Sequence, residues 1–460
     1  MITTFFSSKN LENSILIVFF TLVCVALISF SESYFYVVPI LFAVGLLAYF
    51  FSTIVDGFLP LLFILVSVTI LENSPGIQPI EIPFYLISGI VILYVFIELV
   101  TGRFLIETNL DRLFLCLLLL LPIGVAIGII NGAAPYLAVG ETTYFFGVLA
   151  YFPLRKHLNK KQFELILTSI IGLIIAYVLI RNILNYRQLI VQAILSWQAE
   201  KARVAANEVI LMIGALFCLS SAALTKVRVK QLFFTASFVL FLGGLILTQS
   251  RGYWLAFAFG AFLIFYSINR SGKLRILLTF LLLSSSSIII ANIFFSDFLN
   301  VILNGLLERF SSIGSTKLDI SLQERVLESE TVFKMMLNNP IAGYGFGYTY
   351  TKKILFYSFF EETSYVHNGY LAIWLKLGLL GLITNLSIWI LSIRNSIKLY
   401  RTSTVEKTQI ISLTILGSVF GIMVVNMTSP QVLTFESTLF VTIFCAYVSS
   451  RMEKQTKIEA

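Results

Sequence analysis

The sequence predicts an all-α polytopic membrane protein with about 12–14 transmembrane helices and one large helical loop outside the membrane. Hydrophobic residues make up 58% of the 460 residues and charged residues only 12%, and the mean hydropathy is +0.92. Many apolar runs reach the length of about 20 residues with which a helix crosses a bilayer. Because backbone groups in lipid must be paired within the segment, these runs are expected to be helices.

Fourteen candidate spans follow one another along the chain, and the third and sixth are short enough that twelve or thirteen crossings remain possible. They lie near 15–31, 34–54, 58–72, 82–100, 113–131, 138–154, 162–181, 207–224, 231–249, 253–269, 274–294, 368–393, 408–427 and 431–449. Turn-forming residues, such as Asp56-Gly57, separate neighbouring spans. The spans and loops divide the chain into four segments, 1–200, 201–294, 295–367 and 368–460.

The basic residues fall in alternate loops, which sets the orientation of the chain. They are Arg103 and Arg112, Arg155 to Lys161, Lys226 to Lys230, Arg270 to Arg275, Arg394 to Lys407, and Arg451 to Lys457. With both termini in the cytoplasm, all these loops are cytoplasmic. His157 lies in one of them and is interpreted as exposed surface. The loops near 182–206 and 295–367 then face outward. The net charge of +8 therefore reflects membrane topology, and we expect the bilayer as a partner and no nucleic acid.

The outer loop 295–367 is expected to contain an amphipathic helix. Ser321 and Glu324 have the spacing of a capping box, apolar residues follow at helical intervals, and Asn338-Asn339-Pro340 ends the pattern. Such a helix is suited to lie on the membrane surface or to cover a cavity.

His367 is one of two histidines in the chain, and it stands where the outer loop meets the next span. An imidazole can take up and return a proton near neutral pH, so His367 is a candidate general base. The alternative is a histidine that anchors the helix end through hydrogen bonds. The adjoining Asn368 and Tyr370 are candidate substrate-binding residues.

Three arginines fall on the outer face, although Lys and Arg are usually enriched on the cytoplasmic face. Each is therefore expected to bind an anionic partner. They are Arg203, Arg251 and Arg325. A guanidinium group binds phosphate oxygens through a planar fork. The alternatives are ion pairs of Arg203 with Glu200 or Glu208, contact of Arg251 with lipid headgroups, and an exposed ion pair of Arg325 with Glu328 or Asp319.

Glycine occupies every second position of the stretch from Gly343 to Gly347. Glycine permits tight turns and close approach of the backbone to a ligand, and the interleaved aromatic rings could pack on sugars. Tyr344 and Gly345 are therefore candidate substrate-binding residues; the alternative is an interfacial loop with aromatic anchors. The four cysteines lie in apolar spans without metal-ligand spacing, and we expect no metal and no cofactor.

The chain resembles the bacterial O-antigen ligase and O-antigen polymerase superfamily over residues 200–390. The resemblance is carried by Thr248-Gln249-Ser250-Arg251-Gly252, by the outer loop with Arg325 and the turn from Pro340 to Gly345, and by His367-Asn368-Gly369-Tyr370-Leu371 followed by Leu377 to Leu382. Arg203 with Asn207 is a weaker match. The chain departs from the family pattern at Ala206, where a proline is usual, and in lacking a tryptophan shortly after Arg325.

The resemblance implies a GT-C-like membrane glycosyltransferase in the cytoplasmic (inner) membrane, with its site on the periplasmic or extracytoplasmic face. It implies metal-independent, inverting transfer of a glycan from undecaprenyl diphosphate. The acceptor would be a lipid A-core sugar in a ligase or a second lipid-linked glycan in a polymerase. Arg203 and Arg251 would hold the diphosphate, and His367 would be the essential histidine.

Two other classes of protein share some of these features. A flippase or anion transporter would also need many spans and outward arginines, although it is expected to show broken helices in two related halves. A membrane scaffold without catalytic activity is the third possibility.

Overall fold

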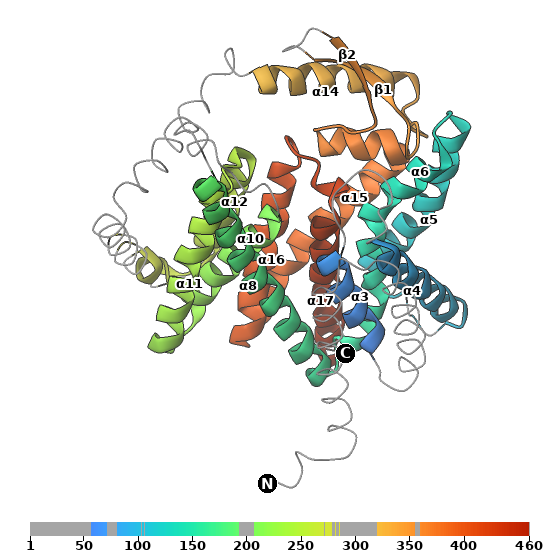
Figure 1. Cartoon of the computed structure of the whole chain (residues 1–460). Coiled ribbons are helices and arrows are strands. Elements are labelled where there is room, and N and C mark those ends of the chain that lie inside the picture. Colours follow the sequence, from blue (N-terminus) through green and yellow to red (C-terminus); the bar gives the residue numbers. More distant parts are fainter. Residues whose placement is uncertain are drawn as a thin grey trace.

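The structure is a computed structural model, and it describes residues 57–70, 81–102, 104, 106–192, 207–270, 272–277, 281, 285, 320–354 and 359–459. These residues form a bundle of long helices, with one helix and a β-hairpin lying across one end (Figure 1). Within the described residues, seven helices are long and apolar enough to cross a membrane, and two shorter apolar helices accompany them. The predicted all-α polytopic membrane fold is therefore confirmed.

Most helices follow the predicted apolar runs, but the helix predicted over 162–181 continues to Gln192, into the predicted outer loop 182–206, and the predicted span 138–154 is divided into three shorter helices. The helices are α3 (Phe58–Ile70), α4 (Ile82–Val100), α5 (Asn109–Ile130), α6 (Pro135–Thr142), the 3-10 helix η2 (Thr143–Ala150), α7 (Tyr151–His157), α8 (Lys161–Gln192), α10 (Glu208–Leu224), α11 (Arg228–Leu247), α12 (Arg251–Ser267), α14 (Ile320–Asn338), α15 (Gly369–Thr402), α16 (Glu406–Val425), the 3-10 helix η4 (Gln431–Leu433) and α17 (Phe435–Glu459). The predicted spans 15–31 and 34–54, and most of 274–294, lie outside the described residues.

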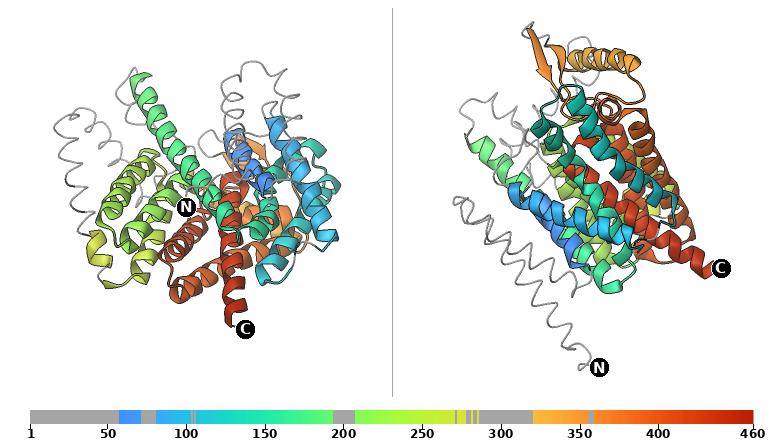
Figure 2. Two further views of the ribbon diagram at one scale, coloured as in Figure 1. Left: turned by 90° about the horizontal axis from the view of Figure 1, so that it is seen from below. Right: turned by 90° about the vertical axis from the view of Figure 1, so that its right-hand side faces the viewer.

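The basic loops that were assigned to the cytoplasm meet at one end of the bundle. Lys156 Nζ lies 2.6 Å from Glu98 Oε2, and Lys407 Nζ lies 3.1 Å from Glu164 Oε1. Near the end of α17, the hydroxyl of Ser450 donates to Oδ1 of Asn159, between α7 and α8, at 2.9 Å. The helix α14 lies at the opposite end (Figure 2). The loops thus share one end, as their alternation requires, and the assignment of that end to the cytoplasm stays a prediction.

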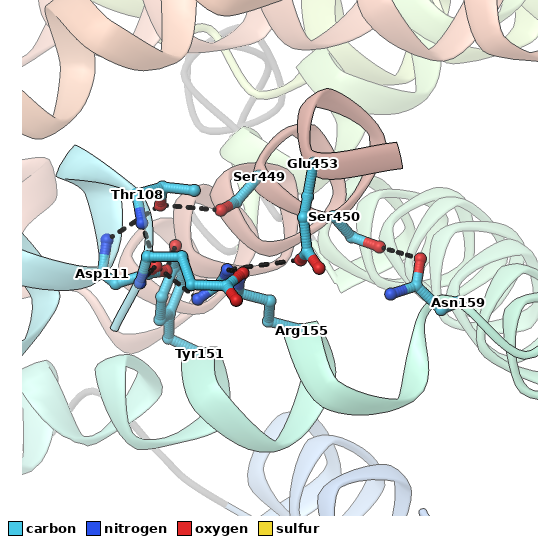
Figure 3. Close-up of polar contacts among 9 residues, drawn as sticks. Thr108, Asp111, Tyr151, Arg155, Asn159, Ser449, Ser450 and Glu453 are labelled. Atoms are coloured by element: carbon cyan, nitrogen blue, oxygen red, sulfur yellow. Dashed lines mark hydrogen bonds and ion pairs between the residues drawn. The ribbon is translucent and has the colours of Figure 1, made fainter. Parts of the chain in front are cut away.

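A buried polar network ties α5, α7 and α17 together at this end (Figure 3). The side chain of Arg155 is 7% exposed and pairs with Asp111, and its Nη2 lies 3.3 Å from carboxylate oxygens of both Glu107 and Glu453. The hydroxyl of Tyr151 donates to Asp111 Oδ1 at 2.7 Å. A buried charge needs such partners because leaving it unpaired in a low dielectric is costly.

His157 corrects one expectation. Its side chain was interpreted as exposed surface, yet the residue is 2% exposed and its ring centroid lies 5.5 Å from that of Phe163. The interpretation is wrong because His157 is the last residue of α7 and its ring packs against Phe163 of α8 and lies close to Gly57, just before α3. Loop position in the sequence did not reveal this packing.

The outer loop contains more than the predicted helix. The strands β1 (Tyr350–Ile354) and β2 (Phe359–Thr363) pair antiparallel, with Tyr350 opposite Thr363. The helix α14 ends at Asn338, as expected, but it already includes Ser321, so the predicted capping box at Ser321 is wrong. The hairpin was not predicted from the sequence, because its strands are short and rich in charged residues.

The helix α15 is interrupted at Gly378, and the turn that follows α14 packs against this interruption. Gly378 has φ 67° and ψ −173° inside this helix, and the next amide, that of Leu379, donates to the carbonyls of Pro340 and Ile341 at 3.2 and 3.1 Å. A β-carbon on Gly378 would lie 2.0 Å from the Ile341 carbonyl oxygen. Glycine is therefore required there, and the outer loop is held directly against the start of α15.

Candidate active site

One face of α14 points toward the bundle and carries a carboxylate. Glu328, Val332 and Met336 follow at intervals of four residues and are 3%, 0% and 0% exposed. Residues four apart lie on the same face of a helix, so Glu328 is placed in line with two apolar core residues. A carboxylate in such a position must be hydrogen-bonded or paired.

His367 provides the main partner of Glu328. Oε2 of Glu328 lies 2.8 Å from Nδ1 of the imidazole and accepts a hydrogen bond of 2.8 Å from the backbone amide of His367. One carboxylate oxygen therefore holds both the main chain and the ring. The side chain of His367 remains 30% exposed, so the far side of the ring can be reached from outside.

The second oxygen of Glu328 faces the hairpin. The hydroxyl of Tyr350 lies 3.0 Å from Oε1 of Glu328 and 2.9 Å from the carbonyl oxygen of Tyr365. The ammonium group of Lys352 lies 3.8 Å from Oε1. Strand β1 thus completes the surroundings of the carboxylate and fixes its orientation.

These contacts determine the charge of Glu328. Burial acts to raise its pKa, but the hydrogen bonds and charge of His367 and the bond from Tyr350 outweigh burial and lower the pKa from 4.5. Burial and the negative charge of Glu328 in turn raise the pKa of Tyr350. At neutral pH the pair is therefore a carboxylate beside a protonated phenol.

The ionised carboxylate selects the tautomer of the neutral imidazole. A carboxylate only accepts hydrogen bonds, so Nδ1 carries the hydrogen and Nε2 keeps its lone pair. The ring of Tyr365 packs edge-on against His367, with centroids 5.0 Å apart and planes at 89°. A base oriented by a third group in this way is a recurrent arrangement in catalytic sites.

The segment after α16 connects the three motifs that contain Arg251, Arg325 and His367. Nη1 of Arg325 donates to the Thr428 carbonyl at 2.9 Å. A β-carbon on Gly252 would lie 3.1 Å from Oγ1 of the same threonine. The amide of Gly369 donates to the carbonyl of Asn426 at 2.8 Å. Residues 252, 325 and 369 therefore meet around residues 426–428.

Arg325 and His367 also line one pocket. It has a volume of about 40 Å³ and is lined by Glu324, Arg325, Glu328, Lys352, Lys353, Ile354 and His367. Arg325 does not form the exposed ion pair with Glu328 that was one of its alternatives, since Glu328 is engaged by His367 and the hairpin and Arg325 reaches Thr428 instead.

Arg251 is the first residue of α12 and follows a strained turn. Gln249 has φ 52° in this turn, a left-handed conformation that is costly for a residue with a β-carbon. Arg203 lies outside the described residues, but Asn207, the N-cap residue of α10, shows the same left-handed backbone with φ 57°.

Asn368 and Tyr370 use their polar groups to hold the start of α15. The side-chain oxygen of Asn368 accepts from the amides of Tyr370 and Leu371 at 3.0 and 3.2 Å, which makes it the N-cap of the helix. The hydroxyl of Tyr370 donates to the Met423 carbonyl at 2.7 Å. Both residues therefore position His367, and substrate contact by either stays a proposal.

The glycine-rich stretch approaches helices closely. Gly345 has φ 86°, and a β-carbon there would lie 2.0 Å from the amide nitrogen of Gly128 in α5. The hydroxyl of Tyr344 donates to the Met335 carbonyl at 3.3 Å, and its ring lies 4.6 Å from that of Tyr348. Packing alone explains the glycine, and contact of these residues with sugars stays a proposal.

Two buried charged groups were not recognised from sequence, one in the site and one that ties the outer loop to α15. Glu328 was predicted only as a possible ion-pair partner of Arg325. Its four-residue spacing to Val332 and Met336 indicates that it lies on the buried face of the helix. Lys376 is fully buried in α15, and its Nζ lies 2.6 Å from Oε2 of Glu141. The same carboxylate oxygen accepts from the Gly347 amide at 2.6 Å, which ties α6, the glycine-rich stretch and α15 together.

A family model described as O-antigen ligase matches residues 236–386, about a third of the chain. The match runs from α11 to the first half of α15 and includes Arg251, Arg325, Glu328 and His367. It confirms the recognised O-antigen ligase and polymerase superfamily for this segment. No curated protein sequence matches the chain.

Proposed function

We propose that this chain, a member of the O-antigen ligase and polymerase superfamily over residues 236–386, transfers a lipid-linked glycan to an acceptor on the outer face of the cytoplasmic membrane. The donor is an undecaprenyl-diphosphate-linked glycan. His367 is the general base, Glu328 orients it, and Arg251 and Arg325 bind the diphosphate, together with Arg203.

The contact between His367 and Glu328 carries this proposal. An imidazole that serves only as a helix anchor needs no carboxylate behind it, because Asn368 already caps α15. A general base does need one, since the carboxylate fixes the tautomer and stabilises the imidazolium that forms when the base takes a proton. The 2.8 Å contact therefore favours the catalytic interpretation.

The reaction proceeds by a single displacement. A hydroxyl oxygen of the acceptor attacks the anomeric carbon of the donor, and Nε2 of His367 takes the hydroxyl proton. The bond between the anomeric carbon and the diphosphate oxygen breaks, and undecaprenyl diphosphate leaves with the bonding electrons. In-line attack inverts the configuration at the anomeric carbon.

Negative charge grows on the diphosphate as this bond breaks. Fixed guanidinium groups stabilise such charge more strongly in the transition state than in the bound donor, which is the requirement for catalysis. Arg325 is already held in place through Thr428, and Arg251 is held by the turn before α12. They neutralise charge that a metal ion neutralises in many other glycosyltransferases.

The acceptor distinguishes a ligase from a polymerase. We favour a lipid A-core sugar, as in a ligase; a second lipid-linked glycan, as in a polymerase, is the alternative of the same chemistry. Both acceptors reach the site from the outer face, opposite the end that gathers the basic loops.

The test uses purified protein in lipid nanodiscs, defined undecaprenyl-diphosphate glycan, and each acceptor in turn, with chelator present. We expect product with one acceptor, about 100-fold less with His367→Ala, and an unchanged rate with the exposed variant Glu330→Ala. Product formation by His367→Ala at the wild-type rate refutes the general base. Flipping of the donor across vesicles without any glycosidic product supports a transporter instead.

A further inference from the structure

A groove runs between α5 and α15, far from the candidate active site. It has a volume of about 430 Å³ and is lined by Asn109, Arg112, Leu113, Ser387, Ile390 and Leu391. Both helices are candidate membrane spans. The groove therefore opens toward the surrounding membrane, and its volume falls within the range of about 300–1,000 Å³ that is typical of ligand pockets.

The groove has a polar end and an apolar wall. Asn109 and Arg112 belong to the first turn of α5, near the end of the bundle that gathers the basic loops. Leu113, Ile390 and Leu391 form the apolar wall, and Ile390 is 56% exposed. A membrane lipid has the same division, with a polar headgroup joined to an acyl chain.

The polar end carries the positive charge of Arg112, which no acidic side chain among the described residues pairs with. Within the described residues, the exposed side chain of Arg112 makes no hydrogen bond or ion pair. The adjacent carboxylate of Asp111 is turned away, toward Arg155 and Tyr151. Arg394 lies four residues after Ile390, on the same face of α15 and one turn beyond the groove.

We propose that this groove binds one membrane phospholipid with an anionic headgroup. The phosphate is held by the guanidinium of Arg112, with Arg394 nearby, and an acyl chain lies against Leu113, Ile390 and Leu391. Two arginines beside a lipid-facing groove match an anionic headgroup better than a zwitterionic one, because the choline group would add positive charge.

The donor lipid of the proposed transfer reaction is not the occupant. Arg112 follows Asp111 in the first turn of α5, and Asp111 pairs with Arg155 at the end of the bundle that gathers the basic loops. The helix α14 lies at the opposite end (Figure 1), and His367 contacts it through Glu328, so a diphosphate bound near Arg112 could not reach the base. The lipid site is therefore independent of the proposed function, and either proposal can fail without the other.

The test is native mass spectrometry of the purified protein titrated with phosphatidylglycerol or with phosphatidylcholine of the same acyl chains. We expect one tightly held phosphatidylglycerol and at least fivefold weaker retention of phosphatidylcholine. Arg112→Ala should weaken phosphatidylglycerol retention about fivefold. Leu113→Trp, which fills the groove, should reduce retention while the arginine is kept.

Arg401→Ala is the matched control, since it removes an exposed arginine from the same end of the molecule without altering the groove. Its retention of phosphatidylglycerol should equal that of the wild type. Equal retention of both lipids by the wild type overturns the proposal, and so does an equal effect of Arg112→Ala and Arg401→Ala.

Discussion

Replacing Glu328 by glutamine tests the arrangement behind the candidate base with almost no change of shape. In the wild type, Oε2 accepts from two donors of His367, the backbone amide and Nδ1, and Oε1 faces Tyr350. An amide offers one oxygen and one NH₂ group. If the oxygen stays with His367, the NH₂ group meets Tyr350; if it turns, the NH₂ group meets Nδ1 and favours the tautomer with a hydrogen on Nε2.

Either outcome weakens the base. A hydrogen bond to a charged group contributes about 1.5–3 kcal/mol, and the imidazole becomes a cation beside the carboxylate only when His367 takes the proton in the transition state. Losing that contribution corresponds to about a 10- to 150-fold fall in kcat. The Michaelis constant for the donor should change little, because Glu328 is not expected to contact the diphosphate.

The assay compares kcat and KM for Glu328→Gln and Glu330→Gln in the reconstituted system. Glu330 lies on the same helix, is exposed, and forms a surface pair of 2.9 Å with Lys334, so its amide variant should match the wild type. Circular dichroism and thermal melting check that both variants are folded. A kcat for Glu328→Gln within twofold of the wild-type value refutes the orienting role.

Acidification provides a second check on the same pair. Because the pKa of Glu328 is lowered from 4.5, its carboxylate stays ionised as the pH falls below neutral, and imidazole protonation is the event that removes the base. Wild-type kcat should therefore fall as the pH is lowered, because a protonated ring cannot accept the acceptor's proton. The stabilising effect of the Glu328 carboxylate is present above its unfolded pKa and is lost only as the pH falls through its lowered folded pKa.

Three further variants test other parts of the structure. Arg251→Lys should lower kcat/KM at least tenfold while the protein stays folded, because a point charge does not replace a planar fork; a rate near wild type would favour simple headgroup contact. Gly345→Ala should lower the melting temperature by several degrees, because its β-carbon would lie 2.0 Å from the Gly128 nitrogen; an unchanged melting temperature would contradict this packing. A membrane-impermeant maleimide should label Lys334→Cys in intact cells and spare Thr404→Cys; the reverse pattern would invert the topology.

The sequence determined the membrane fold because the spans are set by local hydropathy. A helix that crosses lipid must satisfy its own backbone and be apolar over its length, so each span is encoded within some twenty consecutive residues. The three outer-face motifs were found for a related reason. Arg251, Arg325 and His367 are polar residues beside apolar spans, and such positions are conspicuous in any hydropathy profile.

The contacts among these motifs were decided only by tertiary packing. Glu328 stands 39 residues before His367, and the two meet because α14 folds back over the start of α15. In the sequence, Lys376 is a single charge in an apolar run, and only the folded structure shows that it pairs with Glu141. His157 and Arg155 lie in a predicted loop, yet Phe163 of α8 packs against His157 and carboxylates of α5 and α17 pair with Arg155. Each of these outcomes depends on which helices are neighbours, and helix packing is a property of the whole bundle, which hydropathy along one segment does not encode.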